Sequence, residues 1–196
     1  MKKTSYFKKA LLLATFVAFG LLIASCGNRQ KSSDPRDVAQ ERNVAKFDSK
    51  KQEKDAQFIV NAAEINMAQI QLGQLAQQRG QASHVKEFGK KMEDAYTKSQ
   101  RDLTALANTK RITIPTSPTD GVREAYEKLN EKPGSDFDKA YADMMVSRHR
   151  DAIKTFEDAT TDRYDPEIND WAIATLPDLR TNLNHAIDCQ RKSEEL

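Results

Sequence analysis

From Ser49 onward, apolar residues recur at spacings of three and four, and charged or glutamine-rich stretches fill the positions between them. This is the period of an amphipathic helix, whereas a half-buried strand would alternate apolar and polar residues. No strand-like alternation interrupts the pattern through to about residue 192. The sequence therefore predicts an all-α domain over residues 51–192.

Start and stop signals divide this region into four long helices and one short one. Ser49 and Gln52 have the spacing of a capping box, and Gly80 is placed to end the helix that they begin. Asp165 followed by Pro166 is the residue order that helix starts prefer. The predicted helices cover residues 49–79, 83–108, 120–130, 135–160 and 165 onward, with Ser83 and Ser135 as further caps.

The connections between the long helices are short, long and short, and the long one contains the short helix. This order describes a ferritin-like four-helix bundle with one crossover connection. Pro177 lies inside the last helix, where it removes one hydrogen bond and should cause a kink. The predicted inward residues are Val60, Ala63, Met67, Ile70, Leu75, Val85, Phe88, Met92, Tyr96, Leu103, Leu106, Phe137, Tyr141, Met145, His149, Ile153, Phe156, Ile168, Trp171, Ala172, Leu179, Leu183 and Ile187.

Cys26 follows the small residues Ala24 and Ser25 at the end of an apolar stretch, which itself follows a lysine-rich start. The sixteen residues from 10 to 25 are too few for a retained transmembrane helix, which needs about 20. Small residues before a cysteine resemble the lipobox of bacterial lipoproteins. Residues 1–25 are therefore predicted to be a lipoprotein signal peptide and Cys26 to be lipidated, with an ordinary secretory signal as the alternative.

Removal of the signal peptide changes the charge, because it takes away four lysines and no acids. A formal net charge of +2 becomes about −2, which does not support a nucleic-acid partner. Cys189 is then the one remaining thiol of the sequence, so no intramolecular disulfide is expected. The polar segment that follows Cys26 to residue 50 is predicted to be a flexible tether of about 27 Å root-mean-square length.

Several segments of the chain resemble the DUF4142 family of exported, ferritin-like bacterial proteins. The resemblance covers about residues 55 to 190, with its motifs in the family's order at the matching helical positions. The segments are Phe58-Ile-Val-Asn-Ala-Ala-Glu-Ile-Asn-Met67, Ile112-Thr-Ile-Pro115, Phe137-Asp-Lys-Ala-Tyr141 with His149 after it, and Leu176-Pro-Asp-Leu-Arg180. The family has no settled biochemical activity, so the resemblance implies a fold more than a function.

Two patterns bear on whether the bundle holds metal. The di-iron pattern needs Glu-x-x-His on two helices, and here the residues three before the histidines are Gln81, Val146 and Asn182. The resemblance implies a second acid, an Asp-His pair and two further histidines at positions that here hold Gln69, Ala95-Tyr96, His149 and Asn182. Because Gln, Tyr and Asn are weak ligands but good hydrogen-bond partners, a polar network is predicted there.

Glu64 borders the core, where an ionised carboxylate needs a partner. His149 lies on an apolar stripe, where a histidine is commonly a satisfied core residue, and Asp94 flanks such a stripe, where it can be solvated. The candidates for a weak metal site are Glu64, Asp94 and His149. The predicted polar cluster of the core is Glu64, Tyr96, His149 and Asn182.

Two functions from different classes remain open at this point. The first is a non-catalytic lipoprotein of the bacterial cell envelope, anchored to the periplasm-facing outer membrane, whose bundle binds an envelope protein or acts structurally without a cofactor. The second is a metal-binding or redox ferritin-like protein, with a transition-metal ion at a degenerate site in the bundle core.

The lipid anchor can be tested by replacing Cys26. We expect Cys26→Ala to release the chain from the membrane fraction or to leave an unprocessed precursor, since the alanine cannot be acylated. The measurement is fractionation followed by detection of the chain, with Cys189→Ala as the control that should stay at the membrane. Normal processing and anchoring of Cys26→Ala would show that the lipoprotein prediction is wrong.

Overall fold

The computed structural model describes residues 34–161 and 165–195, and every regular element in these ranges is a helix. The elements are α1 (Pro35–Val44), α2 (Lys50–Arg79), α3 (Ser83–Thr109), α4 (Asp120–Asn130), α5 (Gly134–Thr161) and α6 (Pro166–Glu194). The predicted all-α fold is confirmed. Within the described ranges, none of the helices is long and apolar enough to cross a lipid bilayer.

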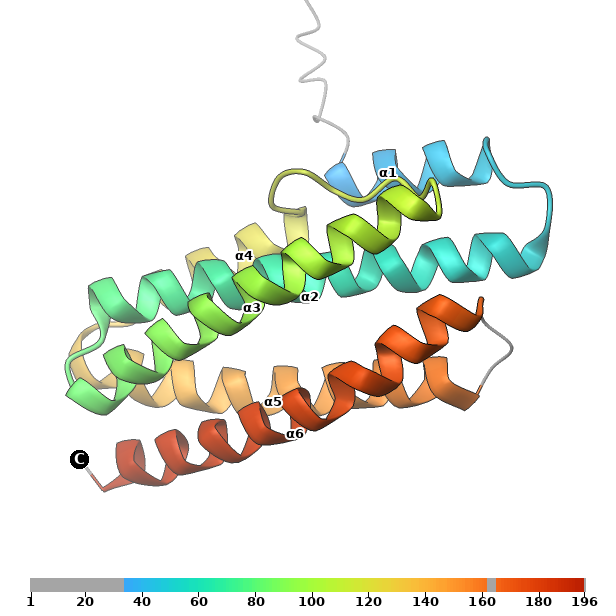
Figure 1. The fold of residues 1–196 in the computed structure, drawn as a ribbon. Coiled ribbons are helices and arrows are strands. Elements are labelled where there is room, and N and C mark those ends of the chain that lie inside the picture. The colour runs from blue at the N-terminus through green and yellow to red at the C-terminus, as the bar shows by residue number, and fades with distance from the viewer. Residues whose placement is uncertain (1–33, 162–164, 196) are drawn as a thin grey trace, which may run out of the picture. The chain divides into compact units, whose positions relative to one another are not determined.

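Two helical hairpins, α2–α3 and α5–α6, pack against each other to form the bundle (Figure 1). The connection of residues 110–133 joins them and contains α4, which packs against α2 and α5. Because α5 begins beside the turn between α2 and α3, this connection has to return along the length of the bundle. The order of short, long and short connections is the one that the sequence predicted.

The core between the hairpins is filled mainly by the predicted stripes. Aromatic contacts join Phe58, Phe156 and Trp171 at one end, Tyr96 and His149 in the middle, and Phe88, Phe137 and Tyr141 at the other end. Ile187 differs from the prediction, because it is 39% exposed. Ala186 and Cys189 take the inward positions in that part of α6.

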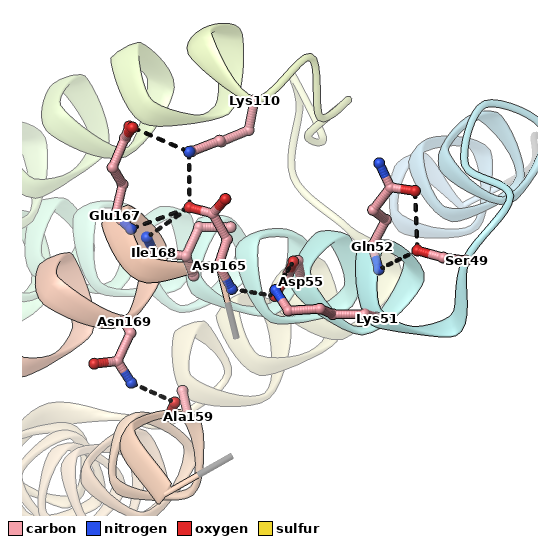
Figure 2. A network of polar contacts seen from close by, with 10 residues as sticks. All are labelled: Ser49, Lys51, Gln52, Asp55, Lys110, Ala159, Asp165, Glu167, Ile168 and Asn169. Atoms are coloured by element: carbon pink, nitrogen blue, oxygen red, sulfur yellow. Dashed lines mark hydrogen bonds and ion pairs between the residues drawn. The ribbon is translucent and has the colours of Figure 1, made fainter. Parts of the chain in front are cut away.

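Two buried aspartates join the hairpins at opposite ends of the bundle. Asp138, on α5, accepts hydrogen bonds from the backbone N–H groups of Gln81 and Ala82 at 2.8–3.2 Å, in the turn before α3. Asp55, on α2, accepts the backbone N–H of Asp165 at 3.0 Å, just before α6 (Figure 2). Each hairpin therefore supplies a carboxylate to the turn of the other.

The end of the bundle drawn in Figure 2 is held by charge as well. Lys110, at the end of α3, lies 2.7 Å from an Asp165 carboxylate oxygen and 3.2 Å from that of Glu167. The hydrogen bond to Asp165 raises the pKa of the Lys110 ammonium group, although partial burial opposes it. Asp165 thereby caps α6 and at the same time ties it to α3.

Most helix boundaries agree with the sequence signals, and the differences have local causes. Ser49 caps α2 by accepting from the Gln52 N–H at 3.2 Å, and Asp165 caps α6 as predicted. Ser83 does not cap α3, because it is the first residue of the helix. The N-cap position is held by Ala82, whose side chain cannot accept a hydrogen bond. Asp138 supplies the bonds before α3, and α5 begins at Gly134, one residue before the predicted cap Ser135.

The prediction of a flexible tether over residues 26–50 is wrong for residues 35–44, which form α1. Asp34 caps this helix, and α1 packs against α2. Asn43 fixes the other end, since its side chain donates to the Thr113 carbonyl at 2.8 Å and accepts the Thr113 N–H at 2.7 Å. Polar contacts hold α1 in place. Because such contacts need no apolar stripe, the sequence pattern does not indicate this helix.

Pro177 does not interrupt α6, which runs as one helix from Pro166 to Glu194. The carbonyl that loses its partner belongs to Ile173, a residue that is 51% exposed. Water can therefore replace the missing hydrogen bond, and the cost of the proline is reduced.

The two helices of the first hairpin approach most closely at a pair of glycines. A Cβ atom on Gly89 would lie 2.6 Å from the Gly73 carbonyl oxygen and 2.8 Å from Ala76 Cβ. A Cβ on Gly73 would lie 2.6 Å from the Gly89 carbonyl oxygen in the same way. The crossing of α2 and α3 thus has no room for any side chain at these two positions.

Gly89→Ala should destabilise the fold by about 1–3 kcal/mol, because the methyl group meets backbone that cannot move without separating the helices. The helix propensity of alanine is up to about 1 kcal/mol more favourable than that of glycine, so the cost of the steric contact has to exceed this gain. Urea unfolding measures the change. Gly121→Ala is the control, since its Cβ meets the tip of the Glu64 side chain at 3.3 Å, and equal stability of Gly89→Ala and wild type would contradict the packing.

Candidate functional site

Glu64 lies on α2 and takes different partners from those that the sequence suggested. Its carboxylate forms an ion pair with Arg36 of α1 and accepts a hydrogen bond from the Thr119 hydroxyl at 2.8 Å. The second terminal nitrogen of Arg36 donates to the Asn61 side chain at 2.7 Å. Glu64 therefore ties α1 and the start of α4 to the bundle, and it is not part of a cluster with Tyr96 and His149.

Asp94 is also away from the bundle interior. The Asp94 side chain is 63% exposed and pairs with Lys90, one turn earlier on α3, at 3.0 Å. Cys26 lies outside the described residues, so its lipidation stays a prediction. Asp94 takes no part in the polar contacts of the core.

His149 is fully buried on α5. Its Nδ1 donates to the Met145 carbonyl at 2.7 Å, and its ring meets the Tyr96 ring edge-on, with centroids 5.9 Å apart. Burial lowers the pKa of His149 to about 4, although the bond to the carbonyl acts in the opposite direction. The ring is therefore neutral near pH 7, and its Nε2 is an acceptor without a partner among the described residues.

Tyr96 links the centre of the core to a groove between α3 and α6. Burial raises the pKa of its hydroxyl, and the nearby Asn182 side chain acts in the opposite direction. No hydrogen bond of ordinary geometry joins the two groups. The groove has a volume of about 400 Å³ and is lined by both residues, together with Trp171, Leu179 and the charged Asp178. Of the predicted cluster, Tyr96, His149 and Asn182 thus gather near the middle of the bundle, without Glu64.

A second cavity, which we call the Arg148 pocket, lies among α1, α2, α4 and α5. It has a volume of about 360 Å³, and its polar lining residues are Arg36, Asn61, Glu64, Gln69, Arg148, Asp151 and Thr155. Gln69 is only 1% exposed, and its Oε1 atom has no partner in the described part of the chain. The pocket therefore combines a buried amide with charges of both signs.

The described ranges contain no group of three or more His, Cys, Asp or Glu side chains that could hold a metal ion. Cys189 is buried on α6, and burial raises the pKa of its thiol to about 11 in spite of a bond to Ser193. It is therefore a neutral thiol within the bundle.

Comparison with known proteins bears on the family. The model of the domain of unknown function DUF4142 matches residues 40–188. The chain belongs to the DUF4142 family. No curated protein and no solved structure matches it.

The match starts inside α1, so the DUF4142 domain includes part of the segment that the sequence suggested was a tether. The residues of the Arg148 pocket were largely missed by sequence reasoning. Arg148 stands directly before His149 but faces a different environment, and Arg36 lies in the segment that was treated as a tether. The spacing of three residues between Asn61 and Glu64 on α2 is the one sequence signal that could have indicated a shared polar face.

The buried histidine gives this DUF4142 domain a defined dependence on pH. The unfolded chain should bind a proton at His149 near pH 6.5, whereas the folded chain binds it only near pH 4. Stability should therefore fall as the pH decreases between these values, by on the order of 3 kcal/mol in total, and this group should have no effect above about pH 6.5.

Urea unfolding of the wild type, His149→Gln and His149→Leu at several pH values in this window tests the effect. Both variants lack the titrating ring, so both should lose this contribution to the pH dependence, whatever their stability at neutral pH. The same slope of stability against pH in all three proteins would rule out a neutral buried His149.

Proposed function

We propose that this DUF4142 protein is a lipid-anchored component of the bacterial cell envelope whose helical domain binds a ligand or an envelope partner and does not catalyse a reaction. In this proposal Cys26 carries the lipid and residues 1–25 are removed. The domain would then face the periplasm at the outer membrane. The charge that remains after processing does not favour a nucleic-acid partner.

The main support is that each candidate metal ligand is bonded to a different structural group. Glu64 holds Arg36 and Thr119, Asp94 holds Lys90 at the surface, and His149 donates to its own helix. A metal that needed all three side chains would have to break the contacts of Glu64 and Asp94 and bring distant positions together. A binding role can use groups that have no such contacts, such as the Arg148 guanidinium group and the Gln69 Oε1 atom of the Arg148 pocket.

One observation favours the alternative of a metal-binding or redox protein. The Nε2 atom of His149 is unprotonated, buried and without a partner among the described residues, so its lone pair is available. A neutral imidazole nitrogen is a good ligand for a transition metal. Its neighbour is the Tyr96 ring, however, and the acids that could complete a site are held elsewhere.

Metal analysis separates the two functions. The full chain, purified without a chelating tag, should contain well below one metal ion per molecule. Its melting temperature should be unchanged in EDTA and after iron, copper or zinc is added back. His149→Ala should lose about 1–3 kcal/mol of stability to the same extent with and without metal.

The opposite result would be stoichiometric metal that survives purification, with a melting temperature that falls in chelator and recovers on adding the metal. If His149→Ala also lost that response, the alternative function would be correct and the binding proposal would be wrong.

A further inference from the structure

The Arg148 pocket has the size and the lining of a small-molecule site. Its volume of about 360 Å³ lies within the range of roughly 300–1,000 Å³ that such sites occupy. One wall is α5, which contributes Arg148, Asp151 and Ala152, and the facing wall is α2. Residues three and four apart share a helix face, so each wall presents several groups to the same space.

Arg148 is a cation without a counter-ion in this pocket. It is partly buried, and within the described ranges it forms no hydrogen bond or ion pair. Burial lowers the pKa of its guanidinium group, although the negative charges of Glu64 and Asp151 act in the opposite direction. A partly desolvated cation favours an anionic partner, and the guanidinium fork matches a carboxylate with two parallel hydrogen bonds.

Gln69 adds an acceptor that also lacks a partner. Its side chain lines the pocket, is almost fully buried, and has an Oε1 atom that accepts no hydrogen bond from the described residues. Buried amide oxygens are nearly always hydrogen-bonded. A ligand that is complementary to this pocket therefore carries a hydrogen-bond donor in addition to its anionic group.

The charges around the pocket decide between a zwitterion and a simple anion. Arg36 and Glu64 neutralise each other in an ion pair, which leaves the side chains of Arg148 and Asp151 as the two charged groups of the lining without a hydrogen bond or ion pair among the described residues. One free positive and one free negative charge suit a ligand with both signs better than a multiply charged anion such as phosphate. Ile65, Val122 and Ala152 complete the lining with apolar surface for an uncharged body.

We propose that the Arg148 pocket binds an α-amino acid or a similarly small zwitterion with an apolar side chain. The carboxylate pairs with Arg148, the ammonium group donates to Gln69 and faces Asp151, and the side chain lies against the apolar wall. This assignment rests on the proposed binding role and names the ligand class for it.

Three matched probes test the assignment on the full chain by calorimetry or NMR titration. They are leucine, 4-methylpentanoate, which lacks the ammonium group, and leucinamide, which lacks the carboxylate. Leucine should bind about tenfold more tightly than 4-methylpentanoate, and leucinamide should not bind at about 10 mM. Inorganic phosphate, as a simple anion, should bind more weakly than leucine.

Substitutions assign the effect to residues. Arg148→Gln should weaken leucine binding by about tenfold or more, and Arg148→Lys should restore part of it. Gln69→Leu should reduce the affinity for leucine to that for 4-methylpentanoate. Arg150→Gln is the matched control, because Arg150 is exposed on the same helix and does not line the pocket, so its affinity should equal that of the wild type.

Phosphate that binds as tightly as leucine, no binding by any probe, or wild-type affinity of Arg148→Gln would each overturn the proposal. The melting temperature of every variant shows whether it is folded. If leucine does not bind and the protein does not respond to metals, only this ligand class is refuted. A bound metal would refute the proposed function, and the leucine titration would then be interpreted independently of it.

Discussion

The exchange of buried carboxylates between the two hairpins is the constraint on which the rest of the bundle depends. A hairpin of two helices exposes backbone N–H groups at its turn, and these groups need partners when another hairpin covers them. Asp138 supplies the partners for the first turn and Asp55 for the second. The opposite hairpin gives each buried carboxylate a hydrogen-bond donor that it needs in the interior, and Asp55 also pairs with Lys51 of its own helix at 3.3 Å. The two carboxylates thereby fix how the hairpins pair as well as how each helix begins.

The same constraint explains how much of this structure the sequence could predict. Periodicity and local caps such as Ser49 and Asp165 act within a few residues, so helices α2 to α6 and their order were predicted correctly. The cap before α3 comes from Asp138, more than fifty residues away, and no local pattern reports it. The helix α1 was missed because only Ala39 and Asn43 are buried along it, so it has no apolar stripe to reveal it.

The candidate site shows the same division between local and distant effects. Placing Tyr96, His149 and Asn182 near mid-bundle required only helix lengths and the crossover topology. Glu64 was assigned to the same level, but its partner Arg36 comes from a segment whose fold the sequence did not reveal. The cation that reaches a carboxylate next to the core determines where that carboxylate points. Which cation this is depends on the tertiary fold. The Arg148 pocket depends on the pairing of Glu64 with Arg36, because α1 forms one side of the pocket.

Arg36 couples the pocket to the N-terminal helix. Because α1 buries little apolar surface and is held by a few polar contacts, it has the features of an element that opens more readily than the rest of a fold. The Arg36 side chain belongs both to the contact that docks α1 and to the lining of the pocket. A ligand that binds only when α1 is docked must stabilise that docking, by mass action and to the extent of its own binding free energy. Occupancy of the pocket would therefore bear on how firmly α1 is held against the bundle.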